Sequence, residues 1–186
     1  MKAEARVKAR AARRAAAIDA RSAAAALAAA AKSLSSWGPV AGYWPIGDEI
    51  DCRPLLAALA GLGCPLALPA VVAPDQPLAF RAWAPGGTLV AGAHGTREPP
   101  ADASLVRPGL VLVPLLAFDR DLYRLGYGGG YYDRTLDRLR RGPQGVRAIG
   151  LAYAAQEVAA VPRDGFDARL DGMLTERGLI GEKGEG

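Results

Sequence analysis

The residues best suited to do chemistry form a glycine-rich turn that begins at Arg124 and ends at Asp133. It reads Arg-Leu-Gly-Tyr-Gly-Gly-Gly-Tyr-Tyr-Asp and has four glycines within residues 126–130. Glycine permits positive φ angles and lets backbone N–H groups approach an anion, so such a turn before a helix favours phosphate binding. Arg124 can pair with phosphate oxygens, and Asp133 can offer a hard oxygen ligand to Mg²⁺. The pattern predicts a nucleotide-phosphate site.

Two familiar nucleotide motifs do not fit this turn. A P-loop needs Gly-Lys followed by Ser or Thr, which this sequence does not contain. Tyr131 stands where a dinucleotide-binding fingerprint needs its last glycine. For the glycines considered alone, a simple tight turn between a strand and a helix remains the alternative.

Basic residues gather at the start of the chain, where Lys2, Arg6 and Arg10 recur every four positions. On a helix they share one face, with Arg13 and Arg14 close to it. The formal net charge of +4 is concentrated in this segment, which favours a local anion site over a uniformly basic surface. A solvated basic face or a nucleic-acid contact is the alternative.

The elements that must position these residues alternate between strand and helix, which is typical of an α/β fold. Strong helix formers extend from residue 2 to about residue 31, with Ser22 as a candidate cap between two helices. The continuous apolar run over 110–116 is typical of a strand that is covered on both faces, at the centre of a parallel sheet. The other expected elements are strands at 40–44, 65–68, 78–83 and 146–152, helices at 53–62 and 131–141, and loops over 85–108 and after 152.

We therefore expect an α/β single domain over residues 1–186, with an open, mainly parallel sheet flanked by helices. A basic helical segment at 1–31 opens the domain, and residues 182–186 form a loose tail. With 186 residues and 51% hydrophobic content, the chain is large enough to bury a core without disulfides.

Soft metal ligands are scarce, because the chain has two cysteines, Cys52 and Cys64, and a single histidine, His94. This excludes a structural zinc site and predicts two free thiols in a reducing cytoplasm. We expect the His94 side chain to be structural or solvent-facing. The alanine block at 23–31 is too short to cross a membrane, and charged residues interrupt any targeting peptide.

The run Val-Pro-Leu-Leu-Ala-Phe-Asp at 113–119, followed by the glycine turn, resembles the signature of the 5-formyltetrahydrofolate cyclo-ligase family. Nearly the whole chain follows the family's order of shorter motifs: an opening Lys-x-x-x-Arg, a Tyr-Pro-Glu segment, Glu-Pro, a glutamine and Asp-x-x-x-Asp. These motifs correspond here to Lys2 and Arg6, residues 43–49, Glu98 and Pro99, Gln156, and Asp167 and Asp171.

The chain departs from the family pattern at two positions. Leu122 stands where the family usually has a glycine, and Gly129 stands where relatives can have a basic residue. The first departure alters a loop. The second removes a phosphate contact, which Lys2 and Arg6 can offset.

The resemblance implies an ATP-dependent enzyme that closes 5-formyltetrahydrofolate to 5,10-methenyltetrahydrofolate through phosphorylation of the formyl oxygen, with Mg²⁺ as cofactor. By resemblance, catalysis falls to Arg124, Tyr131 and Asp133. ATP binding falls to Lys2, Arg6, Arg124, Gly126, Gly128, Gly129, Gly130, Tyr131 and Tyr132. Folate binding falls to Trp44, Glu49, Tyr127 and Tyr131. The magnesium ligands are Asp133 and Asp167.

Other interpretations stay open at this point. Considered alone, Glu49 belongs to a solvated acidic turn with Asp48 and Asp51, and Trp44 is a core residue. A noncatalytic or altered-substrate relative is an alternative, such as a nucleic-acid-binding module that uses the basic helix, as is another enzyme on the same architecture. The partners we expect are ATP and 5-formyltetrahydrofolate, with no membrane or nucleic acid, for a cytoplasmic monomer or weak homodimer.

Overall fold

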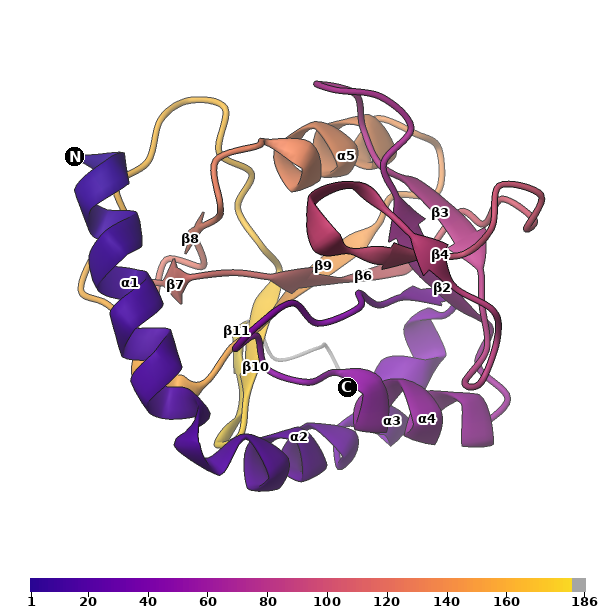
Figure 1. The fold of residues 1–186 in the computed structure, drawn as a ribbon, viewed down its shortest axis with the longest axis horizontal. Helices are drawn as coiled ribbons and strands as arrows, with labels where there is room; N and C mark the ends of the chain where they lie inside the picture. The colour runs from indigo at the N-terminus through magenta and orange to yellow at the C-terminus, as the bar shows by residue number, and fades with distance from the viewer. Residues whose placement is uncertain (182–186) are drawn as a thin grey trace.

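A seven-stranded sheet forms the centre of the protein (Figure 1). The computed structural model describes residues 1–181, except for the side chain of His94. The tail expected at 182–186 and the expected placement of the His94 side chain lie outside the described residues. The strand order is β11-β10-β9-β6-β1-β2-β3. The strands are β1 (Val40–Ala41), β2 (Leu66–Ala70), β3 (Ala79–Ala82), β6 (Leu110–Pro114), β9 (Arg147–Leu151), β10 (Gly172–Thr175) and β11 (Gly178–Gly181).

The five inner strands of the sheet are parallel, and the two edge strands, β3 and β11, are antiparallel to their neighbours. From β1 the chain adds β2 on one side and β6 on the other, so the winding reverses between β1 and β6. Open α/β sheets bind ligands outside the carboxyl ends of the strands at such a reversal. Two small antiparallel sheets lie apart from it: β4 (Val90–Ala91) with β5 (Arg97–Glu98), and β7 (Ala117–Phe118) with β8 (Arg124–Leu125).

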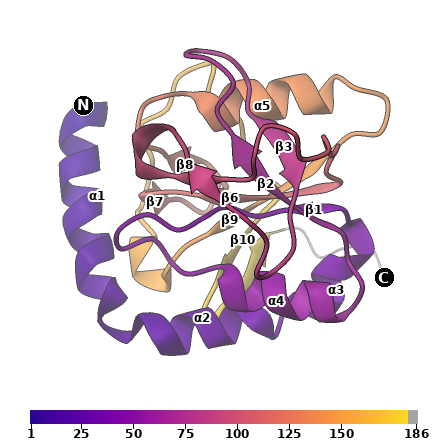
Figure 2. The same cartoon turned by 45° about the vertical axis from the view of Figure 1, so that its right-hand side comes forward.

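Helices cover both faces of the sheet (Figures 1 and 2). One face is covered by α2 (Ala20–Ala28), α3 (Ala31–Leu34) and α4 (Arg53–Gly61), and the other by α5 (Tyr131–Arg140). The first helix, α1 (Lys2–Ala16), packs beside β7 and β8 and against a short 3₁₀ turn, η4 (Ala154–Gln156), that follows β9. The remaining 3₁₀ turns are η1 (Ala17–Asp19), η2 (Ser35–Trp37) and η3 (Ala93–Gly95).

The apolar run of β6 divides its side chains between the two cores. Leu110 and Leu112 pack with the core on the side of α2 to α4, whereas Val111 and Val113 pack with the core on the side of α5. Successive side chains of a strand point to opposite faces, so a strand with helices on both sides needs an uninterrupted apolar sequence. The expectation of a central, doubly covered strand is confirmed.

Three expectations about local structure are wrong. The segment 85–108 is not only a loop, because it contains β4 and β5. The segment after residue 152 is not only a loop, because it contains β10 and β11, and Met173 and Leu174 of β10 are buried. The apolar part of β10 is too short to stand out from its charged neighbours. Ser22 caps no helix: it lies inside α2, whose first turn follows η1 with no side-chain cap. An alanine-rich chain continues as helix without help from a cap.

Two features that we expected from composition concern the cysteines and the membrane. Cys52 and Cys64 are both free and buried. Burial raises the pKa of the Cys52 thiol to about 12, which makes it an inert core residue. Within residues 1–181, no helix is both long enough and apolar enough to cross a bilayer.

Candidate active site

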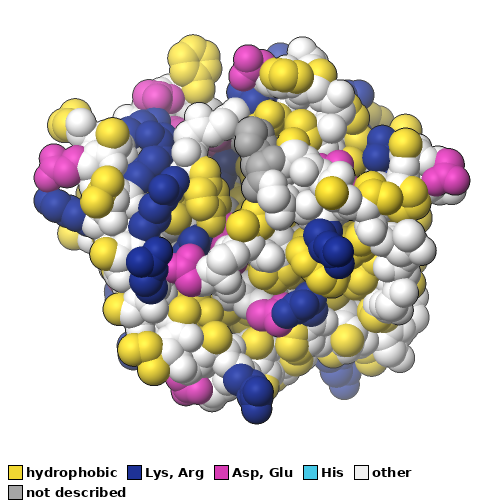
Figure 3. Space-filling model, viewed as in Figure 1, with side chains coloured by type: hydrophobic (Ala, Val, Ile, Leu, Met, Phe, Trp, Pro, Cys, Tyr) yellow, Lys and Arg dark blue, Asp and Glu magenta, His cyan; other side chains and the backbone are white. Residues whose placement is uncertain are grey.

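A cleft of about 1480 Å³ opens at the carboxyl ends of β1 and β6, where the winding of the sheet reverses. Its walls come from α1, the loop after β1, the glycine turn (residues 126–130), the start of α5, the loop 162–168 and the small sheet β4–β5. Figure 3 shows lysine and arginine side chains of α1 in a column along one side of this hollow. The fold therefore places the basic helix and the glycine turn in one site.

The conformation of the glycine turn depends on two positive φ angles. Gly128 has φ 106° and Gly130, which precedes the first residue of α5, has φ 65°. The guanidinium carbon of Arg6 lies 3.2 Å from where a Cβ atom on Gly128 would stand, and Arg6 Nε donates to the Gly126 carbonyl at 3.0 Å. Only glycine allows both this backbone conformation and this close approach. Arg6 and the turn thus lie in direct contact, as the phosphate-site hypothesis requires.

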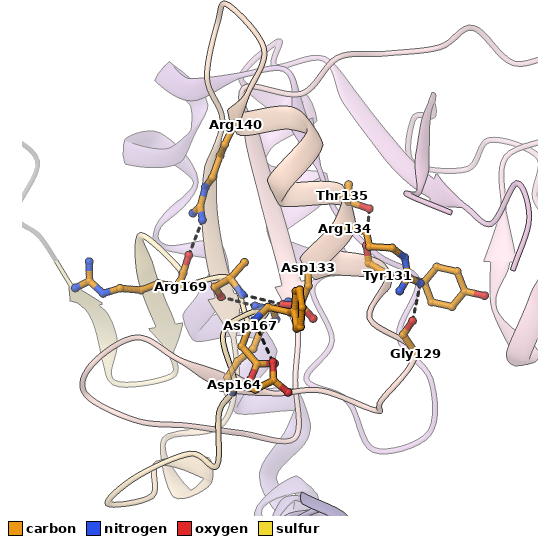
Figure 4. Close-up of polar contacts among 12 residues, drawn as sticks. Gly129, Tyr131, Asp133, Arg134, Thr135, Arg140, Asp164, Asp167 and Arg169 are labelled. Atoms are coloured by element: carbon orange, nitrogen blue, oxygen red, sulfur yellow. Dashed lines mark hydrogen bonds and ion pairs between the residues drawn. The ribbon is translucent and has the colours of Figure 1, made fainter. Parts of the chain in front are cut away.

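Arg124 and Asp133, the two ends of the signature, form an ion pair. Arg124 donates to Asp133 Oδ1 at 2.7 Å and to the Ala168 carbonyl at 2.7 Å, and its side chain is 5% exposed. The N–H of Ala168 donates to the same oxygen of Asp133 at 3.0 Å (Figure 4). The guanidinium of Arg124 therefore orients the carboxylate of Asp133 rather than pointing freely into the cleft. Its predicted contact with phosphate stays a prediction.

Lys2 joins the first helix to the loop 162–168. Its ammonium lies 2.8 Å from Asp164 Oδ2 and 2.7 Å from Asp167 Oδ2. Burial lowers the pKa of Lys2, but the hydrogen bonds and charges of the two carboxylates outweigh it, so the pKa is raised. Asp167 also accepts the N–H of Asp164 at 2.6 Å. Lys2 was expected at the phosphates and Asp167 at the metal. In the structure the two side chains form an ion pair with each other.

The chemistry of the acidic residues fits a magnesium ion that is bound mainly through a nucleotide. Within the described residues, no group of three or more His, Cys, Asp or Glu side chains could hold a metal by itself. Mg²⁺ usually takes one or two carboxylates and completes its shell with phosphate oxygens and water. Asp133 uses Oδ1 for Arg124 and Ala168, so Oδ2 is the oxygen that it could offer.

Glu49 is the centre of a buried polar network at the floor of the cleft. Its carboxylate accepts hydrogen bonds from the Tyr127 hydroxyl and from the N–H of Ile46 at 2.9 Å. Arg13, on α1, donates to both Tyr127 and Asp48 and lies 3.9 Å from Glu49 Oε1. Burial raises the pKa of Glu49, although these hydrogen bonds act in the opposite direction. Glu49 is therefore not part of a solvated acidic turn.

The aromatic residues of the site form two separate groups. Trp44 packs edge-on against Trp83, with ring centroids 6.2 Å apart, and the Arg53 guanidinium lies 5.1 Å from the Trp44 ring. Tyr131 lies at the start of α5 and lines the cleft together with Tyr132. Burial, followed by the nearby charge of Glu49, raises the pKa of Tyr132, so its phenol stays protonated. Trp44 and Tyr131 both line the same cleft.

Two residues of the site were not singled out from sequence: Arg13, which is bonded to the cleft residue Tyr127, and Glu98, which lines the cleft. Arg13 was only one of several basic residues, yet it is buried and tied to the network of Glu49. Glu98 was matched only as part of a Glu-Pro motif, yet its buried carboxylate lines the cleft and accepts from the Val71 N–H at 3.2 Å. Gly92 leaves room for it, since a Cβ there would stand 2.3 Å from Glu98 Oε1. Its place in the Glu-Pro motif was the signal that the sequence offered.

The two departures from the family pattern have clear structural settings. Leu122 has φ 67°, in the left-handed region, while its side chain is buried in the core beneath α5. A glycine at this position would adopt the same backbone conformation without strain. Gly129 lies against Tyr131, because a Cβ atom would stand 3.0 Å from the ring.

Comparisons with known proteins point in one direction. The sequence profile of the 5-formyltetrahydrofolate cyclo-ligase family matches residues 1–176. The 5-formyltetrahydrofolate cyclo-ligase of Mycolicibacterium smegmatis is 35% identical over 151 residues, covering 76% of this chain and 75% of that protein. The protein of the same name from Escherichia coli K12 is 32% identical over 142 residues, covering 73% and 76%.

Solved structures agree with the sequence matches. The solution structure of Aquifex aeolicus 5,10-methenyltetrahydrofolate synthetase aligns with a TM-score of 0.79 at 30% identity, covering 100% of this chain and 95% of that one. The 5,10-methenyltetrahydrofolate synthetase of Mycoplasma pneumoniae aligns with a TM-score of 0.59 at 20% identity, covering 90% and 98%. The second match supports the fold alone.

Proposed function

Because the chain belongs to the 5-formyltetrahydrofolate cyclo-ligase family and is therefore a ligase, we propose that it uses ATP to convert 5-formyltetrahydrofolate to 5,10-methenyltetrahydrofolate. The formyl oxygen takes the γ-phosphoryl group and ADP leaves. The neighbouring folate nitrogen, N10, then attacks the activated carbon and gives up its proton, and phosphate leaves with the former formyl oxygen. Phosphorylation is needed because the oxygen of an amide-like formyl group is a poor leaving group.

The observation that carries this proposal is the contact of Arg6 with the glycine turn inside the cleft. Phosphoryl transfer needs little covalent help from a protein, but it needs alignment and neutralisation of charge. The backbone N–H groups of the turn and of the start of α5 supply donors, and Arg6 supplies positive charge. We assign the ATP phosphates to this region, with Lys2 at its border.

We assign Asp133, with Asp167 as a second ligand, to a magnesium ion that enters with ATP. The ion would neutralise phosphate charge during transfer. The ion pair with Arg124 fixes the carboxylate of Asp133 at the first turn of α5. Arg124 therefore acts in this proposal as a positioning residue for Asp133.

The folate is assigned to the side of the cleft that contains Glu49. A buried carboxylate can accept hydrogen bonds from the N–H groups of a reduced pterin, and Trp44 and Tyr131 offer flat surfaces on the walls of the same cavity. Tyr127 belongs to both halves, because it lies in the glycine turn and donates to Glu49.

A nucleic-acid-binding role is not favoured by the placement of the basic helix. Arg6 lines the cleft and is bonded to Gly126, and Arg13 is buried and bonded to Asp48, so neither is presented to a large external partner. The two free, buried thiols agree with a reducing cytoplasm, which we propose as the compartment.

The test of the proposed function is an absorbance assay for the methenyl product, formed from 5-formyltetrahydrofolate with and without ATP and Mg²⁺. We expect product only when both are present. Folded protein that makes no product would overturn the proposal, and product formed without ATP would point to different chemistry on the same fold.

A further inference from the structure

Arg134, one residue after the signature aspartate, lies against the glycine turn and has no assigned role in the proposed reaction. Its Nη2 donates to the Gly129 carbonyl at 2.6 Å, and Nη1 lies 2.6 Å from where a Cβ on Gly130 would stand. Its guanidinium carbon lies 5.2 Å from the centroid of the Tyr131 ring. Figure 4 shows Arg134, Gly129 and Tyr131 together on one side of the start of α5, with Asp133 on the other.

The positive charge of Arg134 is poorly neutralised by acidic side chains. Its one ion pair among the described residues spans 3.8 Å to Asp75, whose side chain is 91% exposed. Ion pairs with such an exposed partner contribute little to stability. Its Nε is buried and has no hydrogen-bond partner among the described residues. By contrast, Arg13 and Arg124 each contact a carboxylate at hydrogen-bonding distance. Arg134 therefore brings an almost uncompensated positive charge to the cleft.

The setting of Arg134 favours an anion with several acceptor oxygens. The side chain is 33% exposed and lines the same cleft as the glycine turn. Arg6 borders the turn at Gly126 and Gly128, whereas Arg134 borders it at Gly129 and Gly130. The two cations thus contact successive parts of one anion-binding backbone segment. A phosphate group accepts charge-assisted hydrogen bonds from guanidinium and supplies the missing negative charge.

We propose that Arg134 is a second phosphate-binding cation of the ATP site, complementary to Arg6. This inference rests on the proposed function, because it assumes that ATP phosphates bind at the glycine turn. The contact with the Tyr131 ring and the hydrogen bond to the Gly129 carbonyl restrain the guanidinium, so little side-chain freedom is lost when phosphate binds. Glycine at position 130 keeps this place open, because a side chain there would displace Nη1.

The test compares Arg134→Gln with Arg134→Lys and the matched control Arg138→Gln. Glutamine keeps an N–H donor for the Gly129 carbonyl but removes the charge. Lysine keeps the charge without the planar fork. Arg138 lies on the same helix, is exposed and does not line the cleft. Calorimetry would measure the affinity for a non-hydrolysable ATP analogue with Mg²⁺ over a range of salt concentrations, and the KM for 5-formyltetrahydrofolate would be measured in parallel.

We expect Arg134→Gln to lose about 10- to 100-fold in nucleotide affinity, with a weaker dependence on salt and an unchanged folate KM. Arg134→Lys should recover part of the loss, and Arg138→Gln should match the wild type. Equal losses in the Gln and Lys variants, with the folate KM also raised, would show a merely structural role and overturn the inference. Wild-type affinity in Arg134→Gln would overturn it too. If the wild-type protein itself did not bind the analogue, the proposed function would fail, and the role of Arg134 with it.

Discussion

The phenol of Tyr127 donates a hydrogen bond to the buried carboxylate of Glu49, although the two residues are 78 positions apart in the chain. Tyr127 belongs to the glycine turn, and Glu49 belongs to the loop after β1. Arg13 from α1 donates to the same phenol. Three distant segments thus meet at one hydroxyl group, between the region assigned to phosphates and the region assigned to folate.

The first prediction concerns the hydroxyl group of Tyr127. Tyr127→Phe keeps the ring but deprives Glu49 of a donor and Arg13 of an acceptor. Hydrogen bonds to charged groups contribute about 1.5–3 kcal/mol, so the folate KM should rise about tenfold or more. The KM for ATP should change much less. Steady-state kinetics with each substrate varied in turn would check this, and an unchanged folate KM would remove Glu49 from the folate site.

A second prediction follows from the raised pKa of Glu49. A carboxyl group with a folded-state pKa above its unfolded value binds more protons in the folded protein, so its ionisation destabilises the fold. Its favourable contribution is complete below the unfolded pKa and is lost as the pH rises through the folded pKa. The stability of the wild type relative to Glu49→Gln should therefore increase as the pH falls from neutral toward the ordinary range of a glutamate. Urea unfolding of both proteins between about pH 5 and 8 measures this, and the opposite trend would show that the pKa is lowered.

The third prediction concerns Asp133. In Asp133→Asn the amide oxygen can still accept from Arg124 and Ala168, so the fold should persist, but the charge for magnesium is lost. Turnover should fall on the order of 100-fold, with a need for more Mg²⁺. Asp102→Asn, at an exposed position that does not line the cleft, is the control and should keep its turnover. A turnover of Asp133→Asn equal to that of the control would refute the metal assignment.

The fourth prediction concerns the stability of variants at Leu122, whose backbone has a positive φ angle. Removing the buried side chain should destabilise the protein by about 2–5 kcal/mol in Leu122→Ala. Leu122→Gly removes these atoms and the Cβ as well, but it also relieves a left-handed conformation that costs a residue with a Cβ atom about 1–2 kcal/mol. The glycine variant should thus be the more stable of the two, which reverses the usual order within helices and strands. Thermal unfolding of both variants would decide, and an alanine variant that melts higher would show that strain at this position is negligible.

Sequence alone predicted the parts of the fold that depend on local pattern. The run Leu110–Pro114 could be placed at the centre of the sheet because uninterrupted apolar sequence is needed only by a doubly covered strand. The turn before α5 was predictable because it contains more glycines than an ordinary turn between a strand and a helix requires. By contrast β10, with four residues, has too little periodicity to identify, and its burial follows from pairing with β9.

The pairing of side chains could not be predicted from sequence. Lys2 and Asp167 were both expected in the site, but their direct ion pair depends on how α1 packs against the loop 162–168. Arg13 and Arg14 are equivalent in sequence, yet only the first faces inward, because the helix has one definite rotation about its axis. Tertiary packing determines which side chains pair and which face inward, and the spacing of residues in the sequence does not reveal this.

The ion pairs of Lys2 join residues separated by 162 and 165 positions, so one wall of the cleft is completed by two segments that lie far apart in the chain. During synthesis on the ribosome, α1 emerges before the loop 162–168, so its cleft-facing lysine lacks these two partners until that loop follows. The strands from β1 to β9 precede this loop, whereas β10 and β11 follow it, so the sheet and the wall of the cleft are both completed late. A nascent chain halted before this loop would therefore lack two strands of the sheet and would be unable to enclose its substrates.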